Sequence, residues 1–147
     1  MRLSPLSTLL LVAALSACAS APGPGDPDYP FNVSGPYQGR FIFDGQPFDA
    51  TMNLRIDGSG RVRGAFRVGA PVDVDGPING VVIDDLLRVT VRYTAPDGCE
   101  AELEGVLTVE RGGNVVEGPV TVSGCGSPIA GTMAFRRVDR LRRPGGF

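Results

Sequence analysis

The chain has 147 residues, of which 42% are hydrophobic and 20% charged, and its formal net charge of −2 offers no excess that would attract a nucleic acid. It contains neither His nor Lys, so Ser-His-Asp, Cys-His and Ser-Lys nucleophilic sites and His-ligated zinc are excluded. We therefore expect a protein that is not an enzyme and that holds no metal or cofactor.

Residues 1–17 have the features of a secretory signal. Arg2 supplies a positive start, an apolar run follows at 9–15, and the small residues Ser16 and Ala17 end the segment. The apolar run is too short to cross a bilayer as a permanent helix, so we expect the segment to be removed on export.

The four residues Leu15-Ser16-Ala17-Cys18 resemble the lipobox of bacterial lipoproteins. The resemblance implies cleavage after Ala17, a lipid on Cys18, and attachment to a membrane through that lipid. Because residue 19 is Ala rather than Asp, it also implies an outer-membrane location in the cell envelope, facing the periplasm. An ordinary signal peptide with a chance cysteine is the alternative.

Residues 18–36 form a segment rich in proline and glycine. Such a composition cannot lie inside a helix or a sheet, and it predicts an extended tether that holds the domain away from the membrane. The alternative is a strap that packs on the domain through Tyr29 and Phe31.

From residue 37 to residue 138, apolar and polar residues alternate, which is typical of strands. Turn-forming residues separate eight such runs: 37–43, 48–56, 61–68, 72–82, 87–94, 99–110, 114–123 and 129–138. No stretch between them is long enough for a crossover helix, so neighbours in sequence should pair antiparallel. The predicted fold is all-β: an eight-stranded antiparallel up-and-down meander that forms a small closed or nearly closed barrel.

The predicted interior of this barrel is apolar. Eight strands enclose a space that side chains just fill, or that keeps room for one small ligand. For the second case, strand phase selects five ligand-facing candidates: Tyr37, Phe41, Phe66, Tyr93 and Phe135. The outline is similar to the calycin-like lipocalin and avidin barrels, although the tryptophans typical of both families are absent.

Glycine occurs 21 times, about twice the usual share of ~7%. It recurs in a motif of the form apolar-x-Gly-x-apolar-x-apolar, always on the inward phase: Gly39, Gly64, Gly80, Gly105, Gly118 and Gly131. Missing inward side chains let strands bend tightly into a small barrel, and they can also hollow out a ligand cavity. Both interpretations stay open at this point.

Two cysteines are left once Cys18 is assigned to the lipid. An exported protein resides in an oxidising compartment, which favours a disulfide between Cys99 and Cys125. Aligning Leu103 with Val122 places both cysteines at the open end of one hairpin, which supports the bond.

The outer face of the predicted barrel is charged. Alignment of the fifth and sixth strands is expected to set Arg88 opposite Glu104 and Arg92 opposite Glu100. Outward charges of this kind exclude an outer-membrane barrel, whose outer face contacts lipid.

Asp73 and Asp75 lie on the same side of one strand, about 6–7 Å apart. Paired carboxylates at this spacing occur in inverting glycosidases, and together with Asn79 they could hold Ca²⁺. Their hydrated, convex position favours a structural role, in which Arg67 pairs with Asp73 across the third hairpin.

The chain ends in a basic tail at 139–147. The arginines that could contact an anionic membrane surface are Arg136, Arg137, Arg140, Arg142 and Arg143. A tail that is simply solvated is the alternative.

These features together predict a membrane-anchored lipoprotein that acts as a non-enzymatic interaction or structural module toward an envelope protein. Periplasmic inhibitors of lysozyme and of proteases are similar in plan, as small lipidated barrels, but the chain lacks their inhibitory motifs. The alternative function is a carrier or sensor of a small apolar ligand inside the barrel. No nucleic-acid partner is expected.

Overall fold

The structure, a computed structural model, describes residues 18–138. It contains eight strands: β1 (Gly35–Phe43), β2 (Gln46–Ile56), β3 (Arg61–Val68), β4 (Val74–Ile83), β5 (Leu86–Thr94), β6 (Glu100–Val109), β7 (Val115–Ser123) and β8 (Ile129–Arg137). Each predicted strand agrees with the structure to within two residues at either end. Among the described residues, no helix is long and apolar enough to cross a membrane.

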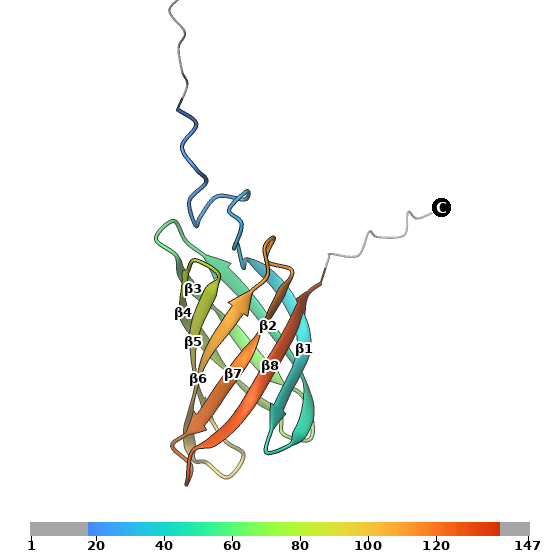
Figure 1. Cartoon of the computed structure of the whole chain (residues 1–147). Coiled ribbons are helices and arrows are strands. Elements are labelled where there is room, and N and C mark those ends of the chain that lie inside the picture. The colour runs from blue at the N-terminus through green and yellow to red at the C-terminus, as the bar shows by residue number, and fades with distance from the viewer. Residues whose placement is uncertain (1–17, 139–147) are drawn as a thin grey trace, which may run out of the picture.

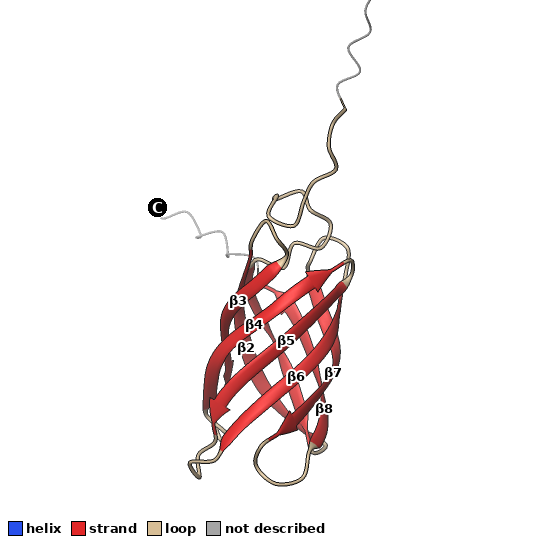
Figure 2. Ribbon diagram, turned by 90° about the vertical axis from the view of Figure 1, so that its left-hand side faces the viewer, coloured by secondary structure: helices blue, strands red, loops and turns tan. Residues whose placement is uncertain are grey.

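The strands form a closed barrel in sequence order, in which neighbours pair antiparallel and β1 pairs with β8 (Figure 1). Closure confirms the predicted all-β meander and leaves no strand with a free edge. One end, which we name the strap end, carries residues 23–34 and three turns: 57–60, 84–85 and 110–114 (Figure 2). The opposite end, which we name the distal end, carries four turns: 44–45, 69–73, 95–99 and 124–128.

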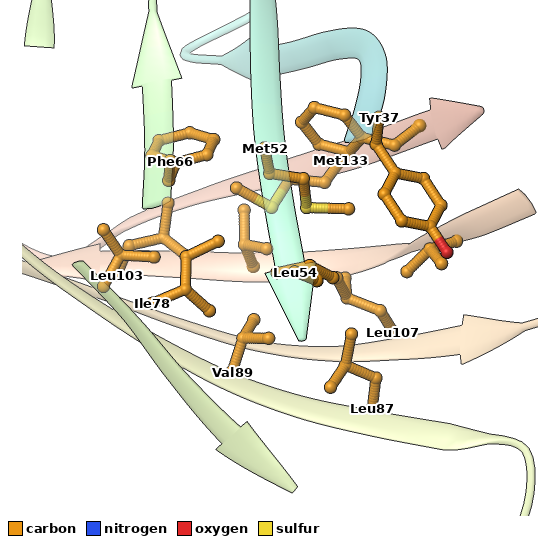
Figure 3. Close-up of a cluster of buried hydrophobic side chains, with 14 of the residues drawn as sticks. Tyr37, Met52, Leu54, Phe66, Ile78, Leu87, Val89, Leu103, Leu107 and Met133 are labelled. Carbon is orange, nitrogen blue, oxygen red and sulfur yellow. The ribbon is translucent and has the colours of Figure 1, made fainter. Parts of the chain in front are cut away.

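Apolar side chains from all eight strands meet inside the barrel, because every second residue of a strand points to the same face. Figure 3 shows part of this core, in which Phe66 and Tyr37 lie in one cluster with Met52, Met133 and aliphatic side chains. The Phe66 ring also meets Phe41 and Phe135 edge to face, with centroids 6.0 and 6.5 Å away. The interior of the barrel is therefore a packed core.

The inward glycines lie where neighbouring backbones approach closely. A Cβ atom on Gly39 would lie 2.0 Å from the Ala134 carbonyl oxygen, and one on Gly64 would lie 1.9 Å from the Asn53 carbonyl oxygen. No side chain can occupy such a position without moving a strand. The structure thus favours bending and close packing of the wall over a hollow interior.

The predicted pairing of β6 with β7 is confirmed. Leu103 lies opposite Val122, and the Cys99–Cys125 disulfide forms with its Cα atoms 5.9 Å apart. Gly124 takes a positive φ of 100° just after β7, which offsets the chain where the second cysteine must reach the first.

The predicted pairing of β5 with β6 is wrong by two residues. Arg92 lies opposite Glu102 instead of Glu100, and these two side chains form an ion pair at 2.8 Å. The turn at 95–99 explains the shift, since the Ala95 amide donates to the Cys99 carbonyl and so pairs Cys99 with Ala95, two residues further along β5 than the predicted alignment. A shift of two residues keeps the same side chains on the inner face, so the core contains the side chains that the pattern predicts. Arg88 accordingly faces Val106 and not Glu104.

Candidate functional site

Residues 23–34 form a strap that closes one end of the barrel (Figure 1). Val33 has no exposed surface, while Tyr29 and Phe31 meet edge to face at 6.0 Å and pack against the core. The expectation of a free tether over 18–36 is therefore wrong for this part, and the alternative of a strap describes it. The physical reason is that these apolar side chains cover core residues that the barrel alone would expose.

Hydrogen bonds hold the strap to one strand and one turn of the barrel. The Gly112 amide donates to the Pro30 carbonyl at 2.7 Å, and the Ile56 amide donates to Ser34 Oγ at 3.1 Å. The strap thus contacts β2 and the turn between β6 and β7, which lie on different sides of the barrel.

Tyr37 and Arg137 form a polar cluster beneath the strap, which we name the latch. The two residues are direct partners across β1 and β8, and the guanidinium lies 5.5 Å from the centroid of the phenol ring. Tyr37 Oη donates to the Gly113 carbonyl at 2.6 Å, and Arg137 Nη2 donates to Tyr37 Oη at 3.0 Å. The guanidinium also donates to the carbonyls of Asn32 and Gly112. One arginine therefore joins the strap, β1, β8 and the turn between β6 and β7.

The protonation of Tyr37 suits this arrangement. Burial raises the pKa of its phenol above the ordinary value, and the positive charge of Arg137 offsets part of that rise. The phenol stays protonated at neutral pH and can donate its hydrogen to the Gly113 carbonyl.

The latch changes the expected role of one arginine in the predicted membrane-contacting set. Arg137 is half-buried and its guanidinium is occupied by the strap, so it is not a free membrane contact. Arg136 is exposed, and Arg140, Arg142 and Arg143 lie outside the described residues. A signal for the latch exists in the sequence, because Arg137 falls on the inward phase of β8 beside the inward Tyr37.

The five predicted ligand-facing side chains all lie on the inner side of the wall. Four of them are almost completely buried: Tyr37, Phe41, Phe66 and Phe135. Phe66 meets Phe41 and Phe135 edge to face, and Tyr37 belongs to the latch. Tyr93 is half-buried and lies near the distal end, where burial raises the pKa of its phenol.

The distal end carries half-buried apolar side chains and the disulfide, and we name this set the rim. The apolar members are Phe43, Phe48, Val72 and Tyr93, and all pack against the edge of the core. The disulfide joins the turns 95–99 and 124–128. Only hairpin turns lie at this end in the part of the chain that Figure 1 describes.

The core contains no buried charged side chain, and the 18–138 region shows no cluster of acidic or cysteine ligands that could hold a metal ion. Asp73 is paired with Arg67 at 3.4 Å, as expected from the sequence. The main surface depressions open to solvent on the outer wall, beside wall glycines such as Gly64 and Gly105.

Cys18, the residue of the lipobox resemblance, is exposed at the start of the described chain, beyond the strap.

Comparison with known protein families and curated proteins adds no relative that would assign a role to either end of the barrel. No known protein family matches the chain, and no curated protein matches it.

Proposed function

We propose that the protein is a lipid-anchored lipoprotein of the bacterial envelope, facing the periplasm, and that it works as a non-enzymatic interaction module. The observation that carries the proposal is the opposite placement of strap and rim. The strap and latch hold the segment that leads to Cys18 at one end of the barrel. The distal end, which carries four turns and the half-buried aromatic side chains of the rim, then points away from the membrane toward a partner protein.

The chemistry of the rim supports a protein partner. Aromatic side chains such as Phe43, Phe48 and Tyr93 supply contact area at a small cost in conformational entropy. The Cys99–Cys125 disulfide restrains two of the four turns, so these turns lose little further freedom on binding.

The lipid anchor is tested by metabolic labelling with a tagged fatty acid. The full chain should take up the label and sediment with membranes, whereas Cys18→Ala should lose both properties. The test is specific because the other two cysteines are joined to each other. Equal labelling of both forms would rule out the anchor at Cys18.

The interaction surface is tested in cells by placing a photo-crosslinking amino acid at single exposed positions. Asp44 and Pro96 probe two turns of the distal end, and Thr121 on the outer face of β7 is the matched control. We expect both distal positions to give one crosslinked product with the same partner, and Thr121 to give none. Products from Thr121 alone would place the partner on the wall and overturn the assignment of the rim.

The edge-to-face packing of Phe66 against Phe41 and Phe135 inside the barrel favours the interaction module over the alternative of an apolar-ligand carrier. Native mass spectrometry of the mature, non-lipidated protein separates the two functions. We expect the mass of the bare chain, 2 Da below the fully reduced value because of the disulfide. An additional mass that disappears on denaturation would establish the carrier function instead.

A further inference from the structure

Two arginines face each other on the outer wall of the barrel. Arg55 on β2 and Arg63 on β3 are direct cross-strand partners, and both side chains are exposed. Directly opposed residues of an antiparallel pair have Cβ atoms about 5 Å apart, so two like charges at this position repel and weaken the pairing. The Arg55–Arg63 pair is therefore expected to destabilise the barrel locally.

Asp57, two residues after Arg55, accepts hydrogen bonds from the Ser59 hydroxyl and the Arg61 amide and forms no ion pair with either arginine. In the 18–138 region, no ion pair involves either guanidinium, whereas Arg67 has Asp73 and Arg92 has Glu102. On its other side Arg63 faces the neutral Asn79 of β4.

Both arginines line a depression on the outer wall. Its lining combines Arg55 and Arg63 with small or neutral polar groups: Ser34, Gly35, Pro36, Asn53, Leu54, Gly64 and Ala65. Gly64 has no side chain, and Ser34 and Asn53 place a hydroxyl and an amide among the lining groups. The depression is thus wide enough for a small polar group and carries two positive charges with no carboxylate in its lining.

We propose that this depression binds a phosphate group, held between the guanidinium groups of Arg55 and Arg63. Guanidinium is planar and can donate two parallel hydrogen bonds to phosphate oxygens, and a bound dianion would remove the repulsion between the arginines. The site lies toward the strap end, since Arg55 is the second-last residue of β2 and Arg63 the third residue of β3. A lipid headgroup is therefore the expected source of the phosphate, and this choice of source rests on the proposed anchoring at Cys18.

The site itself is tested without any lipid. The Nε–H signals of arginine in the mature chain carrying Cys18→Ala are followed by NMR while inorganic phosphate is added. We expect the signals of Arg55 and Arg63 to move together with one dissociation constant, and Arg55→Gln or Arg63→Gln to weaken binding about tenfold. Arg40→Gln is the matched control, because Arg40 is also exposed on the wall but lies opposite Asp49.

The stability of the same variants provides an independent measurement. Arg55→Gln should raise the midpoint of thermal unfolding in the absence of phosphate, because it removes the repulsion, and should reduce the further increase that phosphate causes in the wild type. Equal phosphate shifts in the wild type, Arg55→Gln and Arg63→Gln would overturn the site.

The source of the bound phosphate is tested by sedimentation of the same proteins with phosphatidylglycerol vesicles. Binding that falls in Arg55→Gln and Arg63→Gln but not in Arg40→Gln assigns the phosphate to a lipid. Binding of inorganic phosphate at the site, with vesicle binding equal in all variants, assigns it to a free phosphate compound. Because these proteins carry no lipid, failure of the site is distinguishable from failure of the proposed anchor.

Discussion

The two ends of the barrel are closed by different means. At the strap end, a segment from outside the meander covers the core, and Arg137 ties it down through the carbonyls of Asn32 and Gly112. At the distal end, a covalent bond links two turns, and the aromatic side chains stay half-buried. The strap end is therefore a packed junction of four chain segments, whereas the distal end keeps apolar surface accessible. This difference is the basis for proposing the distal end as the surface that contacts another protein.

The largest expected effect comes from a glycine in the strap junction. Gly113 has a φ of 74°, and a Cβ atom there would lie 2.1 Å from the Asn32 carbonyl oxygen. Gly113→Ala should lower the free energy of unfolding by about 3–4 kcal/mol, because it adds a backbone clash to an unfavourable φ. The matched change at the distal end is Gly126→Ala, where φ is 98° and no atom lies within 4 Å.

Gly126→Ala should cost only about 1–2 kcal/mol, the strain of the left-handed conformation. Urea unfolding of both variants measures the difference. Equal losses would mean that the strap does not restrain the turn at Gly113, and the contrast between the two ends would fail.

Removal of the disulfide should have the next largest effect. Cys99→Ser combined with Cys125→Ser should cost about 3 kcal/mol, because the bond closes a loop with a sequence separation of 26 residues. Hydrogen exchange should then speed up most in the turns 95–99 and 124–128. The measurement is urea unfolding with and without a reductant, and an unchanged midpoint would show that the rim does not depend on the bond.

A neighbouring pair of arginines tests the latch. Arg137→Gln should cost about 2 kcal/mol, because it leaves a buried tyrosine, one strap carbonyl and one turn carbonyl without their charged donor. Arg136→Gln, which changes an exposed residue by the same charge, should stay within about 0.5 kcal/mol of the wild type. Similar losses in the two variants would indicate a general effect of charge instead of the latch.

The smallest effect is a difference between two tyrosines as the pH rises. Burial raises the pKa of both Tyr37 and Tyr93, and Arg137 offsets part of the rise only at Tyr37. Because the folded-state pKa lies above the unfolded-state value, each phenol contributes stability that is fully present below pH ~10 and is lost as the pH rises through the folded pKa.

Ultraviolet titration of Tyr37→Phe and Tyr93→Phe assigns the two phenols. Arg137→Gln should raise the pKa of Tyr37 further and leave that of Tyr93 unchanged. A shift of both phenols, or of neither, would contradict the electrostatic account of the latch.

Much of the fold could be predicted because it depends on local patterns. Alternation of apolar and polar residues defines the strands, and turn residues define their ends, so eight antiparallel neighbours follow directly. The register of β6 and β7 was also predictable, since the two cysteines constrain it. The register of β5 and β6 was not, because it depends on the hydrogen bonds of one turn and a shift of two residues leaves the hydrophobic pattern unchanged.

The candidate site was predicted less well. Sequence phase correctly placed Tyr37 and Phe66 on the inner side of the wall, but it could not show that such side chains fill the interior. Filling depends on how closely the strands approach at glycines such as Gly39, and that distance is set by neighbours far away in the chain. The arginine pair was missed because only the β2–β3 register places Arg55 opposite Arg63.

By itself, the sequence determined the barrel class, the strand phase, the disulfide and the absence of histidine and lysine chemistry, since each follows from residue type and short-range order. Only the tertiary structure decided that the proline-rich segment is a strap and that Arg137 belongs to a latch. The reason is physical: the latch joins residues 100 positions apart, and its hydrogen bonds exist only once the barrel has closed.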